Sequence, residues 1–173
     1  MIFDVLKYYF FILRKKKNPR TACILFNNLL ISKRKRYNIL RNTGVSVNSN
    51  STIIDPFYFE QGKVTLLGKV FINANCVFLD AGHISIGNNT AIGPNVVLTT
   101  VTHPASPDRR PKETICAPIN IGNNVWIGAN STILPGVSIG DNSVIACNSM
   151  VNADVPPNTL YAGTPAVFKK NLI

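Results

Sequence analysis

Histidine, cysteine and acidic side chains are scarce in this chain of 173 residues, and their scarcity limits its chemistry. There are two histidines, His83 and His103, and 8 acidic residues against 18 basic ones. Two histidines cannot supply a zinc site of three imidazoles within one chain, and the four cysteines lie far apart with no CxxC pair. We therefore expect no metal site, and free thiols in a reducing compartment rather than a disulfide framework.

The sequence also lacks the apolar run of a membrane-spanning helix, which needs about 20 residues. Its first apolar stretch, residues 2–13, is interrupted by Asp4 and Lys7 and precedes a basic cluster at 14–17. A secretory signal has the opposite order and ends in a small-residue cleavage site. These features predict a cytoplasmic protein.

Positive charge is concentrated at one end of the chain. Residues 1–44 contain 11 of the 18 Lys and Arg residues but one of the 8 acids, which leaves 7 of each sign for the rest. This distribution does not fit a uniformly basic nucleic-acid-binding protein, because the positive charge is local to the N-terminal region. We therefore expect no nucleic-acid partner and treat residues 1–44 as a separate basic region.

Aliphatic residues return every six positions through most of the chain. The clearest series is Ile121, Ile127, Ile133, Ile139, Ile145 and Val151. An earlier series is Leu66, Ile72, Phe78 and Ile84, continued after a two-residue shift by Ile86, Ile92 and Leu98 and preceded by Val47, Ile53 and Phe59. A period of six fits neither an amphipathic helix nor a simple alternating strand. Gly, Asn and Asp follow many of these positions and favour tight turns, so each unit is one short strand and one corner.

Three such units close a triangular coil, and stacked coils bury the aliphatic side chains in a continuous interior. The sequence therefore predicts an all-β fold, a parallel β-helix of about five coils over residues 45–165. A sandwich of short strands is the alternative, but it would rarely hold a six-residue register over so many repeats.

Residues 102–118 interrupt the repeat with four prolines and several charged residues. Such a segment predicts a projecting loop, and loops of this kind often carry function. His103 lies at the root of this loop, outside the apolar interior, where an imidazole can accept a proton near neutral pH. His83 is expected to be a surface residue without a role.

Several ordered motifs within residues 45–170 resemble one known family. They are PFYFEQG, VFINANC, TVTHP, PINIGNNVWIGANSTILPGVSIGDNSVI and DVPPNTLYAGTPA. The resemblance is to the maltose, galactoside and nodulation O-acetyltransferases, hexapeptide-repeat enzymes that transfer the acetyl group of acetyl-CoA to sugar hydroxyls. It implies a left-handed β-helix and a homotrimer with active sites between neighbouring subunits.

The same resemblance implies catalytic and acceptor-binding residues. His103 matches the general base that deprotonates the acceptor hydroxyl, and the backbone N–H of Ala129 matches the donor that stabilises the tetrahedral intermediate. Asn73 matches an acceptor-binding residue of the catalytic site, whose amide both donates and accepts hydrogen bonds. Glu60 and Asp80 match positions that contact the saccharide acceptor.

A coenzyme site is also implied by the resemblance. The positions that match its lining are Trp126, Ala129, Cys147, Asn152 and Ala153. Family members commonly carry a basic residue where this chain has Val167, so Lys169 and Lys170 are expected to bind the 3′-phosphate of acetyl-CoA.

Residues 2–13 and 21–41 are predicted to form two helices, each with an apolar face beside basic residues. These helices could cap the open end of the β-helix or lie on an anionic membrane surface, and the sequence leaves both roles open. The basic residues favour a cell-surface polysaccharide or its lipid-linked precursor as acceptor.

The leading prediction is therefore an acetyl-CoA-dependent O-acetyltransferase. The alternatives are an N-acetyltransferase of an amino-sugar or xenobiotic and a non-catalytic trimeric scaffold. Residues 166–173 are expected to form a C-terminal tail.

Overall fold

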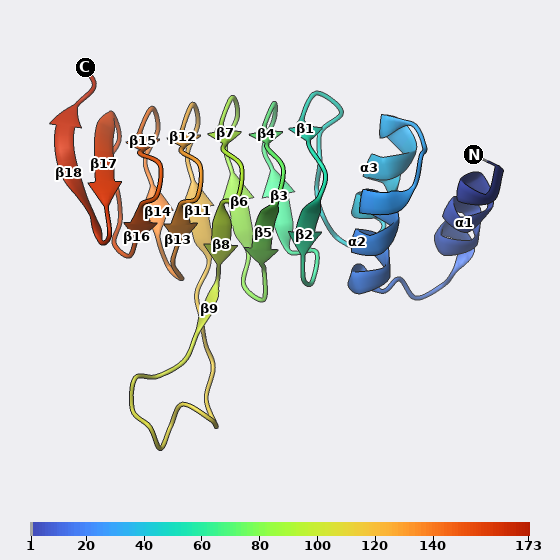
Figure 1. Ribbon diagram of the computed structural model, residues 1–173, viewed down its shortest axis with the longest axis horizontal. Helices are drawn as coiled ribbons and strands as arrows, with labels where there is room; N and C mark the ends of the chain where they lie inside the picture. The colour runs from blue at the N-terminus through green and yellow to red at the C-terminus, as the bar shows by residue number, and fades with distance from the viewer. Residues whose placement is uncertain (1) are drawn as a thin grey trace.

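Three sheets of short parallel strands wrap around one apolar interior in the computed structural model of the protein, which describes residues 2–173 (Figure 1). The chain visits the sheets in the same order in each turn, so each complete turn adds one strand to each sheet. The result is a triangular prism, and the three sheets are called walls 1, 2 and 3, counting from the wall on which Ser46 bridges to Thr65 before β1 (Thr52–Ile53) begins. In the first and last turns wall 1 receives only an isolated bridge, at Ser46 and at Val155.

The strands of each wall are the following. Wall 1 contains β3 (Val64–Leu66), β6 (Ile84–Ile86), β11 (Ile119–Ile121) and β14 (Ser138–Ile139). Wall 2 contains β1 (Thr52–Ile53), β4 (Phe71–Ile72), β7 (Ala91–Ile92), β12 (Trp126–Ile127), β15 (Val144–Ile145), β17 (Thr159–Gly163) and the antiparallel β18 (Ala166–Asn171). Wall 3 contains β2 (Phe57–Phe59), β5 (Cys76–Leu79), β8 (Val97–Thr99), β13 (Thr132–Ile133) and β16 (Met150–Val151).

The six-residue series forms the stacked interior, as predicted. On wall 2 the register pairs Ile72 with Ile92, Ile92 with Ile127 and Ile127 with Ile145. All four side chains are buried. Stacking at the ~4.8 Å spacing of paired strands removes these side chains from water, which is the main stabilisation of such a coil.

Asparagines make the corners of the prism. Asn95, Asn130 and Asn148 have φ values of 58°, 59° and 60°, in the left-handed region that Asn tolerates better than most residues. At another corner the side chains of successive turns form a hydrogen-bonded ladder of Asn89, Asn124, Asn142 and Asn158. The Asn residues at the corners and the aliphatic residues of the interior therefore favour the same strand register between successive turns.

The prism has about six turns, one more than the five predicted. The extra turn comes from residues 155–163, where Val155 bridges to Ile139 and β17 pairs with β15. Its position on wall 1 is held by Val155 rather than by a complete strand, so the aliphatic series alone does not reveal it. β18, within the segment expected as a C-terminal tail, then folds back on β17.

Three helices precede the prism in the described residues: α1 (Ile2–Leu13), α2 (Pro19–Asn28) and α3 (Lys33–Arg41). The prediction of one helix over residues 21–41 is wrong, because the backbone becomes extended at Leu29 and again at Ser32. Leu29 is buried while Leu30 is exposed. The break lets α2 and α3 pack against each other, which a straight helix could not do.

Side chains of α2 and α3 cap the first turn of the prism. Asn27 accepts from the N–H of Phe57 and donates to its carbonyl, each at 3.0 Å, and the Sγ of Cys23 lies 3.0 Å from the carbonyl oxygen of Phe59. The Tyr37 hydroxyl donates to the carbonyl of Ser51. An open sheet edge needs such partners, so the capping role expected for the helices holds for α2 and α3.

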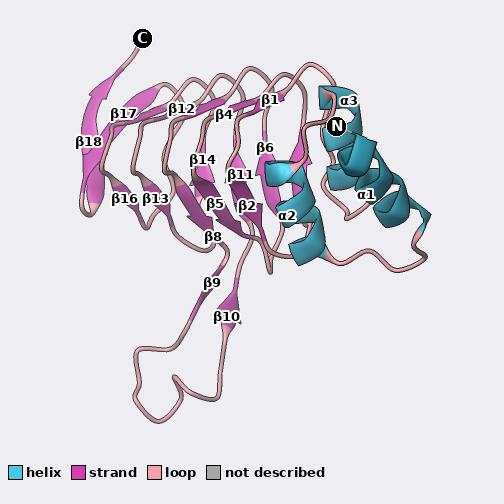
Figure 2. Cartoon of the chain, turned by 45° about the vertical axis from the view of Figure 1, so that its right-hand side comes forward, coloured by secondary structure: helices cyan, strands magenta, loops and turns pink. Residues whose placement is uncertain are grey.

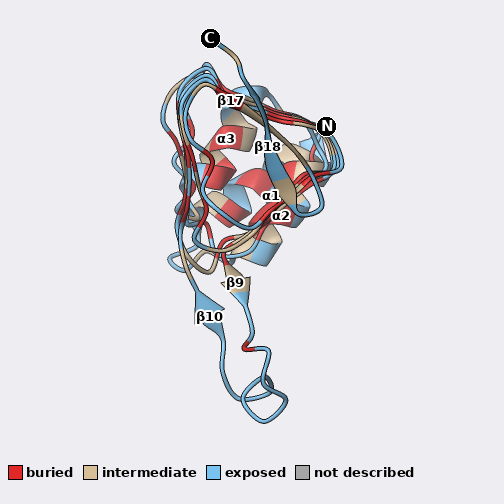
Figure 3. Ribbon diagram, turned by 90° about the vertical axis from the view of Figure 1, so that its left-hand side faces the viewer, coloured by how far each residue is buried: buried red, intermediate tan, exposed pale blue. Residues whose placement is uncertain are grey.

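The predicted projecting loop leaves the prism between walls 3 and 1 (Figure 2). Its root is an antiparallel pair, β9 (Val101–Thr102) and β10 (Ile115–Cys116). Ile121 then pairs with Ile86 as though no residues had been inserted. Most of the loop is exposed (Figure 3), and within residues 2–173 no helix is long and apolar enough to cross a bilayer.

Candidate active site

His103 directly follows β9, where the chain enters the projecting loop. Its Nδ1 lies 2.8 Å from the backbone carbonyl oxygen of Glu113 on the returning side of the loop. Because a carbonyl oxygen can only accept, Nδ1 carries the proton in the neutral ring and Nε2 presents its lone pair. The ring is exposed, so an acceptor hydroxyl can reach Nε2. This is the arrangement that a general base requires.

The loop itself holds the Glu113 carbonyl in place. The backbone N–H of Glu113 donates to the Arg109 carbonyl at 2.9 Å, and the Arg109 guanidinium meets the Glu113 carboxylate at 2.8 and 2.6 Å. This hydrogen-bonded pair lowers the pKa of the Glu113 carboxyl. Glu113 orients His103 through its backbone, so no side-chain pattern in the sequence could have indicated it.

Three other predicted site residues lie at the corner between walls 3 and 1, called corner 3–1, where the loop begins. Glu60 follows β2, and Asn152 and Ala153 follow β16. All three are exposed. Corner 3–1 therefore offers one acidic and one amide side chain on the same edge of the prism as the His103 loop.

Asp80, predicted to contact the acceptor, is fully buried at the same corner. Its carboxylate accepts from the backbone N–H groups of Glu60, Gln61 and Lys63 at 2.6, 2.9 and 2.6 Å. A side chain with no exposed surface cannot touch a substrate, so the structure gives Asp80 a different task. It holds the turn that presents Glu60.

A second group of predicted residues lies at the corner between walls 2 and 3, called corner 2–3. Asn73, Ala129 and Cys147 follow β4, β12 and β15. Ala129 and Cys147 belong to successive turns, whereas β7 lies between β4 and β12 and places Asn73 two turns from Ala129. The turns are in close contact here, because a Cβ on Gly93 would lie 2.7 Å from the Ala129 nitrogen. Within residues 2–173 the Ala129 N–H has no hydrogen-bond acceptor, which leaves this donor for a ligand.

Asn73 is half-buried at corner 2–3. Its Oδ1 accepts from the N–H of Ala74 at 2.8 Å, which fixes the orientation of the amide. The amide NH₂ then remains to donate to an acceptor oxygen, and Oδ1 retains a second lone pair.

Trp126 points outward from wall 2 and is 56% exposed. The strand register places it in one outward row, which runs through Phe71, Ala91, Trp126, Val144, Leu160 and Lys170. From Phe71 to Leu160 this row is apolar, and it ends at Lys170. Lys169 lies at the irregularity between β17 and β18 and has no partner in the register.

The predicted site residues thus form two groups at two different corners of one chain. His103 and Glu60 belong to corner 3–1, whereas Asn73, Ala129 and Trp126 belong to corner 2–3 and its wall. Wall 3 separates the corners by about 15 Å, at ~3.3 Å per residue of strand. One chain therefore does not bring His103 and Ala129 to the same reacting atom.

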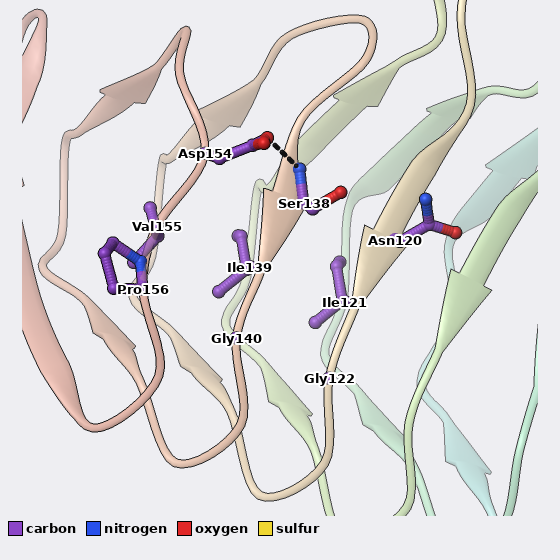
Figure 4. A pocket seen from close by; sticks show the side chains of 9 residues that line it. All are labelled: Asn120, Ile121, Gly122, Ser138, Ile139, Gly140, Asp154, Val155 and Pro156. Atoms are coloured by element: carbon purple, nitrogen blue, oxygen red, sulfur yellow. Dashed lines mark hydrogen bonds between the residues drawn. The ribbon is translucent and has the colours of Figure 1, made fainter.

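A groove of about 370 Å³ on wall 1 lies next to corner 3–1 (Figure 4). Asn120, Ser138 and Asp154 line it from three successive turns, and Asp154 accepts from the Ser138 N–H at 2.7 Å. None of the predicted site residues lines the groove, although Asn152 and Ala153 directly precede Asp154 in the chain. In residues 2–173 no three metal-ligating side chains come together.

Known proteins are similar to this chain both in the six-residue repeat and over most of its length. The family described as bacterial transferase hexapeptide (six repeats) matches residues 118–153. The galactoside O-acetyltransferase of Escherichia coli (strain K12) is 39% identical over 154 residues, which cover 87% of this chain and 76% of that protein. The chain belongs to the hexapeptide-repeat acetyltransferases. The nodulation protein L of Rhizobium meliloti (strain 1021), another relative, is 36% identical over 82% of this chain and 79% of its own.

Solved structures of hexapeptide-repeat acetyltransferases superimpose closely on the prism. An acetyltransferase of Vibrio cholerae in complex with acetyl coenzyme A has a TM-score of 0.85 and 40% identity, covering 90% of this chain and 85% of that one. A galactoside acetyltransferase in complex with coenzyme A also has a TM-score of 0.85, with 36% identity over 90% of this chain and 79% of its own. The resemblance expected from the motifs is confirmed.

Proposed function

We propose that the protein transfers the acetyl group of acetyl-CoA to a hydroxyl group of a sugar. The observation that carries this proposal is the hydrogen bond between His103 Nδ1 and the Glu113 carbonyl, which leaves Nε2 as a proton acceptor on an exposed loop. The names of the relatives support a sugar as acceptor, and the coenzyme complexes of the structural neighbours support acetyl-CoA as donor.

The reaction needs three contributions from the protein. His103 Nε2 takes the proton of the acceptor hydroxyl as its oxygen attacks the thioester carbonyl. The Ala129 N–H stabilises the negative charge that develops on the carbonyl oxygen, a contribution of about 3 kcal/mol for one preorganised donor. The C–S bond then breaks, and the imidazolium returns its proton to the departing thiolate.

These contributions come from different copies of the chain in the proposed enzyme. The His103 loop extends away from its own corner 2–3 group, and a neighbouring copy supplies Asn73 and Ala129. A closed ring of three identical chains repeats this contact three times, because each copy offers one loop and one corner 2–3. We therefore propose a homotrimer with its sites between subunits.

The outward row of wall 2 suggests a path for the coenzyme. From Trp126 to Lys170 it crosses three strand spacings, about 14 Å at ~4.8 Å each, over the apolar side chains of Val144 and Leu160. The pantetheine arm would lie along this row, with Cys147 at its edge. Lys170 meets the phosphate end, assisted by Lys169.

The acceptor lies near Asn73 and Glu60 in this arrangement, the first donating to a sugar oxygen and the second accepting from a sugar hydroxyl. The basic N-terminal helices would place the enzyme at the inner, anionic face of a membrane in the cytoplasm. A cell-surface polysaccharide or its lipid-linked precursor is the acceptor that this location favours.

Release of free thiol from acetyl-CoA in the presence of a panel of saccharides tests the proposal. His103→Ala should lower the rate by about 10²- to 10⁴-fold, the usual effect of removing a general base. His83→Ala is the matched control, because the His83 ring is also exposed but has no role in the proposed transfer. His83 belongs to the preceding turn, where its backbone carbonyl accepts from the Ile119 N–H at 3.0 Å, and this variant should leave the rate unchanged. Absence of turnover with every acceptor would favour a non-catalytic scaffold, and turnover confined to amines would favour N-acetyl transfer.

A further inference from the structure

A cavity of about 580 Å³ lies between α1 and α3, and the proposed acetyl transfer does not use it. Arg34, Lys35 and Arg41 line it, and its lining contains no acidic side chain. Three cations without a facing carboxylate create a strongly positive hollow. Such a hollow favours an anion of more than one negative charge.

Neutral donors complete the lining. Asn38 Nδ2 donates to the Tyr8 hydroxyl at 2.7 Å, and Tyr8 is only 6% exposed. Since this hydroxyl oxygen already accepts from Asn38, its own proton can donate to a ligand. Ser32 adds a second hydroxyl to the lining. Cations combined with O–H donors are the groups that bind phosphate oxygens.

Contacts with α1 and with the start of the prism hold two of the cations in place. Lys35 Nζ lies 5.5 Å from the centre of the Tyr8 ring and 5.3 Å from that of Tyr9. Arg41 donates through Nε and Nη2 to the Val47 carbonyl at 3.0 and 2.7 Å, which uses two of its five N–H groups. The positive charges are therefore positioned before any ligand binds.

Helix α1 stands at the end of the molecule (Figures 1 and 2), and its exposed residues are mostly apolar. Its exposed large hydrophobic side chains are Ile2, Phe3, Leu6, Tyr9, Phe10 and Leu13, and Lys7 is exposed beside them. Tyr9 belongs both to this exposed group and to the cavity lining. Basic residues follow at 14–17. A short helix with this pattern lies within the headgroup layer of an anionic bilayer.

We propose that the cavity between α1 and α3 binds the phosphomonoester headgroup of a membrane lipid, while the exposed apolar side chains of α1 lie among the acyl chains. Three cations match a phosphomonoester, which carries up to two negative charges, better than a phosphodiester, which carries one. The inference rests on the membrane location given under the proposed function, and it is independent of the acetyl-transfer step.

Vesicle binding by the full chain tests this site. Phosphatidylcholine vesicles contain either phosphatidic acid, a phosphomonoester, or phosphatidylglycerol, a phosphodiester, at matched surface potential. We expect at least about fivefold tighter binding to phosphatidic acid, because the extra charge makes charge-assisted hydrogen bonds in the cavity. Equal affinity for the two vesicles would overturn the proposal.

Two double variants that each remove two positive charges distinguish specific binding in the cavity from general electrostatic attraction to an anionic vesicle. Arg34→Gln with Lys35→Gln should abolish the preference for phosphatidic acid, whereas Lys15→Gln with Lys16→Gln should weaken both affinities and retain the preference. Loss of the preference in both, or in neither, contradicts a headgroup site. Thiol release with a soluble sugar should be unchanged in both variants, so failure of acetyl transfer and failure of lipid binding are observed separately.

A soluble probe avoids dependence on the folding of the variants. Dihexanoyl phosphatidic acid below its micelle concentration should shift the backbone amide resonances of Arg34 and Asn38 in the unmodified protein. Inorganic phosphate at the same concentration should shift them less. Equal shifts would assign the cavity to free phosphate rather than to a lipid.

Discussion

His103 and Glu113 stand at opposite ends of the projecting loop, and the hydrogen bond from Nδ1 to the Glu113 carbonyl joins them at 2.8 Å. The bond selects one tautomer, since the carbonyl oxygen has no proton to give. We expect long-range ¹⁵N NMR spectra of the neutral ring to show His103 as the Nδ1–H form. An Nε2–H form would leave no lone pair for the acceptor hydroxyl and would exclude the proposed base.

Because the site residues lie at two corners, and the proposed site combines corners of two subunits, two inactive variants should restore activity when they are mixed in one trimer. Asn73→Ala and His103→Ala should each be nearly inactive, but trimers refolded from an equal mixture should regain about a quarter of wild-type activity, because one site in four then has both residues intact. Thiol release before and after mixing measures this. If both residues belonged to the same chain's site, mixing would restore nothing.

Asp80 should matter for stability through its backbone contacts. Asp80→Ala removes a fully buried carboxylate and leaves three backbone N–H groups without their acceptor, which should lower the free energy of unfolding by about 2 to 4 kcal/mol. Asp154→Ala is the matched control, since Asp154 is exposed and accepts from one N–H, and its cost should stay below about 1 kcal/mol. Denaturant titration compares them, and equal effects would contradict the role assigned to Asp80.

The cap on the prism offers a similar comparison within one helix. Asn27→Leu removes both partners of the Phe57 backbone, and we expect a loss of about 2 to 3 kcal/mol because two buried polar groups become unsatisfied. Asn28→Leu removes only a bond from its exposed side chain to Ile24 of the same helix, so its effect should stay within about 0.5 kcal/mol. Thermal unfolding of both variants decides whether α2 seals the sheet edge.

The interior of the prism could be predicted from the sequence because the same six-residue period governs both residue type and chain direction. Each aliphatic position must be buried, and each Asn or Gly corner must turn, so one pattern determines both. The break at Leu29 could not be predicted, because it depends on how two helices pack over a sheet edge. The structural role of Asp80 could not be predicted either. Its carboxylate accepts from backbone N–H groups 17 to 20 residues away, and the sequence does not distinguish such a carboxylate from one that binds substrate.

The four cysteines should divide into two reactive and two inert thiols. Burial raises the pKa of Cys23 and of Cys76 to about 11, so at pH 8 their thiolate fraction falls and alkylating reagents cannot reach them. Cys116 and Cys147 are exposed and should be alkylated first. If pantetheine passes corner 2–3 as proposed, coenzyme A should slow alkylation of Cys147 several-fold and leave Cys116, on the loop, unaffected. Peptide mass spectrometry of the folded enzyme with and without coenzyme A measures both rates, and equal protection of the two thiols, or protection of neither, would remove Cys147 from the coenzyme path.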